Sequence, residues 1–393
     1  MPLPLEDIKV LDLCRLAPGS FCTMILGDLG ADVLRIEEPE GERRGRPLAT
    51  NADEKRSLAF SPTRRNKRSI ILNLKMDGAR DIFYQLAKRA DVVVEGFRPG
   101  VVRRLGVDYD TVSRVNPRIV YCSISGYGQK GPYRKTPGHD INYVAMSGAL
   151  SLITDGEGRP VVPANLLADL AGGGMQAAIG ILAALMARHK TGRGQMVDIA
   201  MTDGVIYLLA NVVARYFSHG ELPQPREGPL TGGLPHYNVY ETRDGRYIAL
   251  GALEPWFWEN LCRALEREDL IPYQNNTDKY KEIFAFLTQV FRTKTRDEWF
   301  SLLGDKDTCV TPVYTLDEVF ADPQIQQRRM VAEIHHPTWG KVQQVGIPIK
   351  LTETPGQIRS LAPYPGQHTE EVLAELGYRP EQIRELQAAK IVG

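Results

Sequence analysis

Short apolar runs alternate with helical stretches over the first third of the chain. Residues 19–31 and 77–90 place apolar side chains at helical spacing. Between and around them, β-branched and apolar residues form five runs that predict strands, at 8–14, 32–39, 69–75, 91–97 and 118–128. Strands that alternate with helices of this length are typical of βαβ units. The pattern therefore predicts an α/β domain with a mainly parallel sheet, which binds ligands beyond the carboxyl ends of its strands.

The pattern changes in the second half of the chain. A long helix is predicted over 171–190; its apolar run contains three glycines and a glutamine and is short for a membrane span, which indicates a core helix. A strand and a second helix follow over 194–217, and the Gly- and Pro-rich residues 218–235 indicate a linker. Residues 236–253 form two alternating runs joined by Asp244-Gly245, which predicts a β-hairpin.

Composition limits the classes of function. A chain of 393 residues predicts two domains, or one large domain with an insertion. Lys and Arg together number 48, as do Asp and Glu, so no overall field attracts nucleic acid or a membrane, and neither is an expected partner. An anionic ligand then needs a local cluster of cations. The five cysteines match no zinc spacing and indicate reduced thiols in a cytoplasmic protein, because the N-terminus also lacks the pattern of a signal peptide.

Two basic clusters follow predicted strands. Five cations lie in 64–75, ending at Lys75, and Arg98, Arg103 and Arg104 lie in 96–106. A basic run is usually a solvated face, but at the strand ends of a parallel sheet such cations suit phosphates. Phe97 could stack on a flat ring, and the lack of a Walker A sequence means that side chains would hold the nucleotide.

Two further motifs have weaker readings. GYGQKG (126–131) matches G-x-G-x-x-G, but Pro132 follows it and no helix opens there, so a glycine loop over a site is favoured over a dinucleotide fingerprint. His335-His336 suggests metal at first sight. Adjacent side chains diverge in a strand, and no further ligand set is visible, so no metal site is expected.

Three motifs contain candidates for acid–base chemistry. His139 and Asp140 stand side by side in GHDINY, and Asn165 precedes Asp169 by four residues just before the long helix. Asp169 could be a helix N-cap, or the three glycines that follow could admit a ligand and leave backbone N–H groups for an anion. Glu254 follows a predicted strand and is either plain surface or a partner for a histidine.

Taken together, these motifs resemble the class III coenzyme A transferase family (CaiB/BaiF type), and within it the α-methylacyl-CoA racemases most closely. The resemblance covers about residues 5–375. It rests on LAPGSFCTMILGDLGADVLRIEEP, NKRSIILNLK, FRPGV, ISGYGQKGP, GHDINYVAMSG, NLLADLAGGG, GGLPHYNVYETRDGRYIALGALEPWFW and DTCVTPV. Several ordered motifs over this length are far more specific than any single one.

The resemblance implies a domain plan and an assembly. Residues 1–217 would form the N-terminal part of a Rossmann-like CoA-binding domain, 218–235 a linker, and 236–325 a smaller α+β domain. Residues 326–393 would form a second linker and the part that completes the large domain. Two subunits would interlock as a homodimer, with a heteromer of paralogous subunits as the other expectation. Coenzyme A would enter as part of an acyl-CoA substrate, with no cofactor bound permanently.

The resemblance also implies roles for individual residues. His139 and Asp169 would face the substrate's α-carbon from opposite sides, Glu254 would support His139, and Asn165 would lie in the same site. The CoA contacts of the family correspond to Arg15, Leu16, Ala17, Leu72, Lys75, Phe97, Arg98 and Arg104. Glu38 stands where many relatives have a base near the adenosine phosphates, which puts one phosphate contact in doubt.

Two activities stay open at this point. A racemase needs a base and an acid on opposite faces of the α-carbon and a donor for the enolate oxygen, for which the Asp169 N–H is a candidate. A transferase would use Asp169 as a nucleophile, through a mixed anhydride and an aspartyl-CoA thioester. His139, Glu254 and the short TGGLPHY loop favour the racemase; a catalytically inactive CoA-binding subunit is the third reading. The sequence does not identify the acyl group. Four apolar residues could line its pocket or belong to the core: Met146, Leu150, Ile153 and Tyr237.

Overall fold

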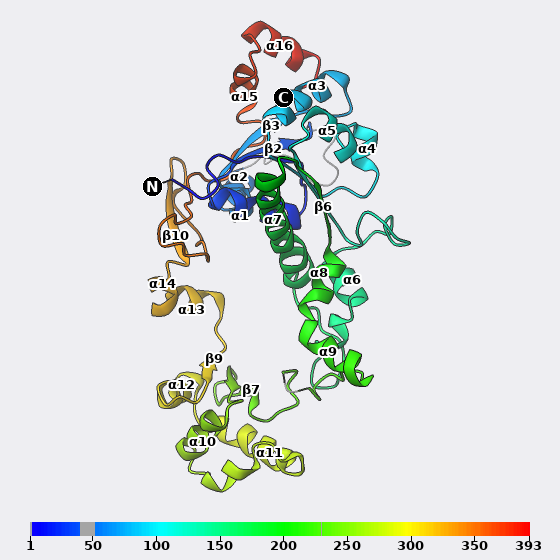
Figure 1. Ribbon diagram of the computed structural model, residues 1–393. Helices are drawn as coiled ribbons and strands as arrows, with labels where there is room; N and C mark the ends of the chain where they lie inside the picture. Colours follow the sequence, from blue (N-terminus) through cyan, green and yellow to red (C-terminus); the bar gives the residue numbers. More distant parts are fainter. Residues whose placement is uncertain (1, 40–51, 229) are drawn as a thin grey trace. The chain divides into compact units, whose positions relative to one another are not determined.

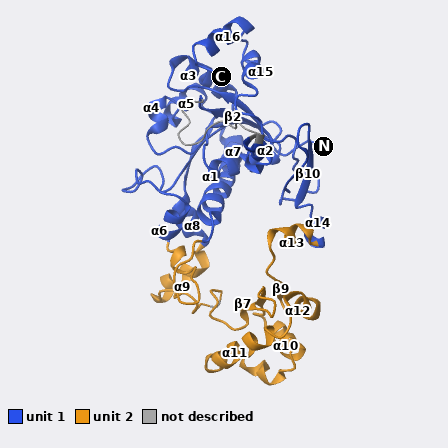
Figure 2. Ribbon diagram, turned by 180° about the vertical axis from the view of Figure 1, so that it is seen from behind, with its two compact units in different colours: residues 1–147, 163–208, 323–393 blue, residues 148–162, 209–322 orange. Residues whose placement is uncertain are grey.

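The computed structural model describes residues 2–39, 52–228 and 230–393. Contacts between Cα atoms divide the chain into two units, coloured separately in Figure 2. Unit 1 comprises 1–147, 163–208 and 323–393, and unit 2 comprises 148–162 and 209–322. The chain therefore passes from the first unit to the second twice, at 148–162 and at 209–322, and returns to the first each time.

Unit 1 is built on a six-stranded parallel sheet (Figure 1). The strands are β1 (Lys9–Asp12), β2 (Asp32–Glu37), β3 (Lys67–Ile71), β4 (Val92–Glu95), β5 (Val120–Ser125) and β6 (Met196–Ala200). All neighbouring pairs are parallel, in the order β3-β2-β1-β4-β5-β6. This is the strand order of the Rossmann fold. The predicted α/β class and mainly parallel sheet are thus confirmed.

The strands are shorter than their apolar runs suggest. The run at 69–75 was predicted as one strand, but β3 spans Lys67–Ile71 and the chain then turns, with the Leu74 N–H bonded to the Leu72 carbonyl at 3.1 Å. Lys75 consequently lies in a loop, four residues beyond the strand. Apolar periodicity marks where a strand exists but not the residue at which its ladder of hydrogen bonds ends.

Helices cover the sheet, and the C-terminal residues of the chain contribute to the same core. The helices of unit 1 are α1 (Ala17–Asp28), α2 (Ala52–Ala59), α3 (Asp77–Arg89), α4 (Val101–Leu105), α5 (Tyr109–Val115), α6 (Asp140–Met146), α7 (Gln176–Thr191), α8 (Met201–Leu208), α14 (Pro323–Gln327), α15 (Thr369–Glu375) and α16 (Pro380–Ala388). A short turn, η2 (Pro62–Arg64), and an antiparallel hairpin, β10 (Val331–His336) and β11 (Gly340–Val345), complete it. Val372, Leu373 and Ile383 join the core formed by the strands and α3. The last residues of the chain therefore finish the same core that the first ones begin.

The long helix differs from its prediction. It was predicted to begin at residue 171, but a π-helix, η4 (Leu166–Met175), precedes α7 and continues into it. The helix ends before Gly192, whose φ of 72° is the left-handed conformation that commonly terminates helices. By length and composition Leu166–Thr191 is also apolar enough to cross a membrane. In the fold one side of it packs against α1, α8, β5 and β6, while Ile179 and Met186 on it are exposed, so the core-helix interpretation holds for that side only.

Unit 2 is a small α+β body with its own core. Strands β7 (Tyr237–Glu241), β8 (Tyr247–Gly251) and β9 (Val310–Pro312) pair antiparallel, and the first two form the predicted hairpin, in which Gly245 has a φ of 71°. Its helices are α9 (Ala210–His219), α10 (Pro255–Ala264), α11 (Tyr280–Phe291), α12 (Arg296–Leu303) and α13 (Leu316–Ala321), with short turns η3 (Ala149–Ser151), η5 (Glu268–Tyr273) and η6 (Thr277–Lys279). Trp258, Phe291 and Trp299 are buried at its centre. Helix α9, which the sequence pattern places in the large domain, groups with unit 2.

Candidate active site

The switch point of the sheet lies between β1 and β4. These strands are neighbours, but the chain passes from β1 to β2 on one side and from β4 to β5 on the other. In doubly wound sheets ligands bind in the crevice at such a point, beyond the carboxyl ends of the strands. Here the guanidinium of Arg15, after β1, lies over the ring of Phe97, after β4, at 4.5 Å. Two of the eight residues predicted to contact CoA, Arg15 and Phe97, are therefore brought together at the switch point.

Arg15 also forms an ion pair with Glu38, which follows β2. The pair places a carboxylate beside the guanidinium that would otherwise face an anionic ligand alone. Glu38 is the residue that the resemblance marked as a departure from the family pattern, and the structure pairs it with Arg15. Any phosphate near Arg15 meets a cation whose charge is partly neutralised.

The remaining predicted CoA contacts have different surroundings. Lys75, Arg98 and Arg104 are exposed on loops or helix ends, and Leu16 and Ala17 stand at the start of α1. The Leu72 side chain is only 1% exposed and packs in the core. Its backbone is buried as well, since its N–H bonds the Glu37 carbonyl and its carbonyl accepts the Leu74 N–H, so the structure leaves Leu72 no surface for the predicted CoA contact.

The basic cluster at 64–75 is largely structural, which corrects both of its predicted roles. Four of its five cations pair with carboxylates: Arg64 with Glu37 at 2.7 Å, Arg65 with Asp28 at 2.6 Å, Lys67 with Asp12 at 3.1 Å and Arg68 with Asp32 at 2.9 Å. Lys67 and Asp12 are fully buried below the loop that contains Arg15. Asp12 also accepts a hydrogen bond from the Cys14 N–H at 2.9 Å, so the pair fixes the backbone of that loop.

His139 and Asp169 belong to neighbouring helices of unit 1. His139 is the exposed residue that precedes α6, and its N–H donates to Asn142 Oδ1 at 3.0 Å. Asp169 is half-buried in the first turn of η4, which packs against α6. Asn165 occupies the N-cap position of η4, and its side chain hydrogen-bonds Asp169. Asn165 and not Asp169 is therefore the N-cap, which removes one of the two readings left open for Asp169.

Opposing influences act on the Asp169 carboxyl. Burial and the neighbouring charge of Asp140 raise its pKa, while the Asn165 hydrogen bond and the proximity of His139 act in the other direction. The net shift is upward, toward the range in which a carboxylate is a more effective base. The packing of α6 against η4 brings the two residues near one another, in line with the effect of His139 on this pKa.

The three glycines after Asp169 serve packing. A Cβ on Gly173 would approach the Met201 side chain, and one on Gly174 would approach the Pro18 carbonyl oxygen at 2.8 Å. A Cβ on Gly204 of α8 would overlap the backbone of Gly172. The glycines therefore let α8 and α1 approach the π-helix closely. They were predicted to admit a ligand, and the structure assigns their space to protein.

Asp140 binds the backbone of the same turn. Its Oδ1 accepts the N–H of Ala168 at 2.9 Å and the N–H of Asp169 at 2.7 Å. The Asp169 N–H, which the sequence suggested for an enolate oxygen, already has this partner, so that expectation is wrong. In the sequence, Asp140 stands out only as the neighbour of His139. No local signal indicates that its carboxylate binds the backbone of a segment 28 residues away.

Tyr143 is the second residue that the sequence pattern missed. Its ring fills the space that a Cβ on Gly126 or Gly138 would occupy, and its hydroxyl donates to the Gly138 carbonyl at 2.5 Å. Burial raises the pKa of Tyr143 to about 12, the charges of Tyr127 and Asp169 add to the shift, and Arg98 opposes it. Tyr143 thus lies within electrostatic reach of both Arg98 and Asp169. The glycine of GYGQKG that precedes Tyr127 is required by this ring.

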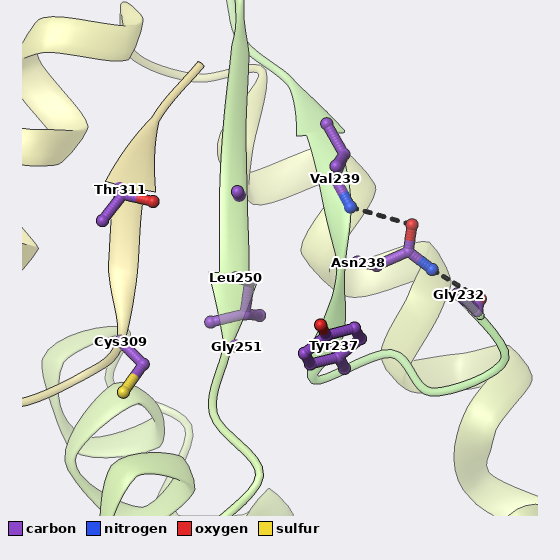
Figure 3. A pocket seen from close by; sticks show the side chains of 9 residues that line it. Gly232, Tyr237, Asn238, Val239, Leu250, Gly251, Cys309 and Thr311 are labelled. Atoms are coloured by element: carbon purple, nitrogen blue, oxygen red, sulfur yellow. Dashed lines mark hydrogen bonds between the residues drawn. The ribbon is translucent and has the colours of Figure 1, made fainter. Parts of the chain in front are cut away.

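Unit 2 contains Glu254 and a cavity. Glu254 is exposed at the N-cap position of α10, and its support of His139 remains a prediction. A cavity of about 390 Å³ lies against the sheet and is lined by Gly232, Tyr237, Asn238, Val239, Ala249, Leu250, Gly251, Cys309 and Thr311 (Figure 3). Asn238 closes one side, because its Nδ2 donates to the Gly232 carbonyl at 2.7 Å and its Oδ1 accepts the Val239 N–H at 2.8 Å. Tyr237 lines this largely apolar cavity, so of the two roles suggested for it, pocket lining and core packing, the structure shows the first.

Comparison with known proteins identifies the family. Residues 5–369 match CoA-transferase family III. α-Methylacyl-CoA racemase from Homo sapiens is 37% identical, over 99% of this chain and 98% of its own, and succinyl-CoA:glutarate CoA-transferase from Homo sapiens is 33% identical, over 99% and 90%. A crystal structure of a CAIB/BAIF family protein from Brucella suis matches with a TM-score of 0.81 and 28% identity, over 96% of this chain and all of the other. Racemases and transferases are thus similar to this chain to nearly the same degree. The chain belongs to CoA-transferase family III.

Proposed function

We propose that this protein racemises the α-carbon of a 2-methylacyl-CoA thioester. The observation that carries the proposal is the placement of His139 and Asp169 on the neighbouring elements α6 and η4 of one unit, within electrostatic reach. A racemase needs two groups that exchange protons with one carbon atom from different directions. The 37% identity to the human racemase supports the same reading.

The proton balance of the reaction uses both side chains. One group, either the Asp169 carboxylate or neutral His139, takes the α-proton. The electron pair of the broken C–H bond moves into the thioester and forms an enolate. The other group, as imidazolium or carboxylic acid, delivers a proton to the opposite face. Each turnover exchanges the protonation states of the pair, so the reverse reaction begins from the state in which the forward one ends. The raised pKa of Asp169 brings it closer to that of an imidazole, which favours transfer in both directions.

The nucleotide would be held by the side chains at the switch point. Arg15 and Phe97 offer a stacked guanidinium and ring, and Lys75, Arg98 and Arg104 offer exposed cations for phosphates. An acyl group on the CoA thiol would then extend from the switch point toward α6 and η4.

Transfer of CoA between carboxylic acids is the second candidate, favoured by the half-buried Asp169 and by the transferase relatives. Asp169 would attack the thioester carbonyl and expel the CoA thiolate, leaving a mixed anhydride. The thiolate would attack the aspartyl carbonyl, releasing the donor acid and forming an aspartyl-CoA thioester. An acceptor carboxylate would then attack the aspartyl-CoA thioester and expel the thiolate, which forms a second mixed anhydride. The thiolate would attack the acceptor's acyl carbon in this anhydride, forming the new acyl-CoA and freeing Asp169. No step of this sequence requires His139.

The test is α-proton exchange in D2O without an acceptor acid. The purified protein is incubated with one enantiomer of a 2-methylacyl-CoA, and mass and stereochemistry are followed. Deuterium at the α-carbon with loss of chirality is the expected result. The near-isosteric Asp169→Asn protein is the control, and it should show no racemisation and no CoA transfer, with exchange left only from the enantiomer whose α-proton His139 takes. Absence of exchange, with CoA transfer once a carboxylic acid is added, would establish the transferase instead.

A further inference from the structure

A widened first turn leaves backbone donors free beside Asp169. In an α-helix, the N–H four residues after the N-cap bonds the N-cap carbonyl. In a π-helix that carbonyl bonds the fifth residue, so one more N–H is left without a helical partner. Asn165 is the N-cap of η4, and the additional free N–H is therefore that of Asp169. The geometry of the turn creates a pair of adjacent donors, at residues 168 and 169.

The Asp140 side chain satisfies both donors. It is 7% exposed and comes from the first residue of α6, directly after His139. Its Oδ1 accepts hydrogen bonds of 2.9 and 2.7 Å from Ala168 and Asp169. Hydrogen bonds from N–H groups to an ionised carboxylate are stronger than those between neutral groups. One carboxylate therefore ties the segment that contains His139 to the backbone of Asp169.

We infer that Asp140 is a positioning residue, which holds the Asp169 carboxylate in register with His139 through the first turn of η4. This inference rests on the proposed function, because the relative position of His139 and Asp169 matters only if both exchange protons with the substrate. It gives Asp140 a role of its own. A shift of about 1 Å at a reacting group can lower a rate about a hundredfold, so a fixed turn matters to catalysis.

Asp140 also affects the charge state of Asp169. The titratable groups that act on Asp169 lie on α6 or at its N-cap. Burial is the main cause of the raised Asp169 pKa, Asp140 raises it further, and His139 lowers it. The charge of Asp169 in turn raises the pKa of the Tyr143 phenol. On α8, which also packs against η4, Asp203 acts on Asp198 instead. Removal of the Asp140 charge should therefore lower the pKa of Asp169.

Two substitutions separate position from charge. Asp140→Ala removes the acceptor of both N–H groups, whereas Asp140→Asn keeps an oxygen acceptor and removes the charge. We expect Asp140→Ala to lower kcat for α-proton exchange by about tenfold or more, with KM for acyl-CoA changed less than about threefold. Asp140→Asn should recover most of kcat and move the acidic limb of the kcat/KM profile to lower pH, because Asp169 then loses its proton more readily.

Asp108 supplies a matched control. It caps α5 by accepting the Thr111 N–H at 3.3 Å, and within the described residues its carboxylate hydrogen-bonds Thr111 and no group of α6 or η4. Asp108→Ala should leave kcat and the acidic limb unchanged even if it lowers the melting temperature. Wild-type kcat in Asp140→Ala, or an unmoved acidic limb in Asp140→Asn, would overturn the inference; if Asp140→Ala does not fold, Asp140→Asn decides alone.

Failure of the proposed function is distinguishable from failure of this inference. A wild-type protein that transfers CoA but exchanges no α-proton would reject the racemase. The same variants would then be measured by transfer, for which Asp169 must be held equally well as a nucleophile. A loss of about tenfold in transfer by Asp140→Ala would retain Asp140 as the positioning residue, and an unchanged transfer rate would reject it.

Discussion

Glu95 is a buried carboxyl group at the end of β4, one residue before the loop that contains Phe97. It is 1% exposed, and its Oε2 accepts the Phe97 N–H at 2.8 Å. Burial raises the pKa of Glu95 to about 7, and the charge of Asp198 adds to the shift, while hydrogen bonds from Ser123 and Phe97 oppose it. A single residue thus couples protonation near neutral pH to the backbone of the expected nucleotide loop.

The raised pKa of Glu95 predicts a pH-dependent stability. Its folded pKa lies above the unfolded value, so its stabilising contribution is full below the unfolded value, near 4.5, and is lost as pH rises through about 7. The free energy of unfolding of the wild type, relative to Glu95→Gln, should fall by roughly 2–3 kcal/mol between pH 5 and pH 8. Urea denaturation of both proteins at the two pH values measures this; a constant difference would contradict it.

His139 is the residue whose replacement best separates the two chemistries. Loss of a general acid–base group costs about 10²- to 10⁴-fold, and CoA transfer has no step that needs it. We therefore expect His139→Ala to lower racemisation by that factor, to retain α-proton exchange from only one enantiomer, and to leave any transfer largely intact. Chiral analysis of exchange in D2O checks this. Equal losses of exchange and transfer would show that His139 binds substrate rather than moving a proton.

At the scale of elements, the crossing of η4 and α8 determines where Asp169 lies. Gly204 and Gly172 meet backbone to backbone, which no residue with a side chain allows. This close approach explains why a glycine-rich, weakly helix-forming sequence follows the candidate catalytic residue. The wide turns of a π-helix are frequent at functional sites, and here the tight crossing accompanies one.

Gly204→Ala tests the crossing. The new methyl group would overlap the Gly172 backbone, so η4 must move, and we expect a destabilisation of about 1–3 kcal/mol together with about a tenfold or larger loss of exchange. Gly156→Ala is the matched control, because a Cβ there meets nothing within 4 Å. Chemical denaturation and the D2O assay give the two readouts. Normal activity in Gly204→Ala would show that the position of η4 is not critical.

At the scale of the whole molecule, a neutral chain must bind an anionic substrate locally and carries exposed apolar helices. Net charge is zero, so the cations at the switch point, and no overall field, would attract CoA. On α7 and α8, Met186 and Tyr207 are 63% and 73% exposed. Apolar side chains of this kind are typical of surfaces covered by another protein, and the interlocked homodimer remains a prediction.

The dimer is tested by mass in solution. Light scattering after gel filtration should give about 88 kDa, twice the chain mass of 43.9 kDa. Tyr207→Asp would place a charge on the exposed apolar surface of α8, and it should shift the mass toward one chain. A wild-type mass near 44 kDa at micromolar concentration would reject the dimer, and an unchanged mass in Tyr207→Asp would place the interface elsewhere.

The alternation of strands and helices, the hairpin at 236–253 and the motifs that contain His139 and Asp169 follow from sequence by itself. Periodicity is a local property, set by the backbone repeats of two and 3.6 residues, and it survives without knowledge of distant contacts. The same locality explains the errors at β3 and at the start of η4. Element ends depend on hydrogen bonds that compete with the pattern.

Only the tertiary structure decided which charges belong to the site. Lys67 looks like a phosphate ligand in sequence, but the fold buries it against Asp12. Asp140 looks like a neighbour of His139, but the fold brings its carboxylate to a backbone turn almost thirty residues away. Burial and hydrogen bonding across such distances depend on how the elements pack, which no local spacing records. The sequence thus determined which chemical groups are present, and packing determined which of them are paired, buried or left to meet a substrate.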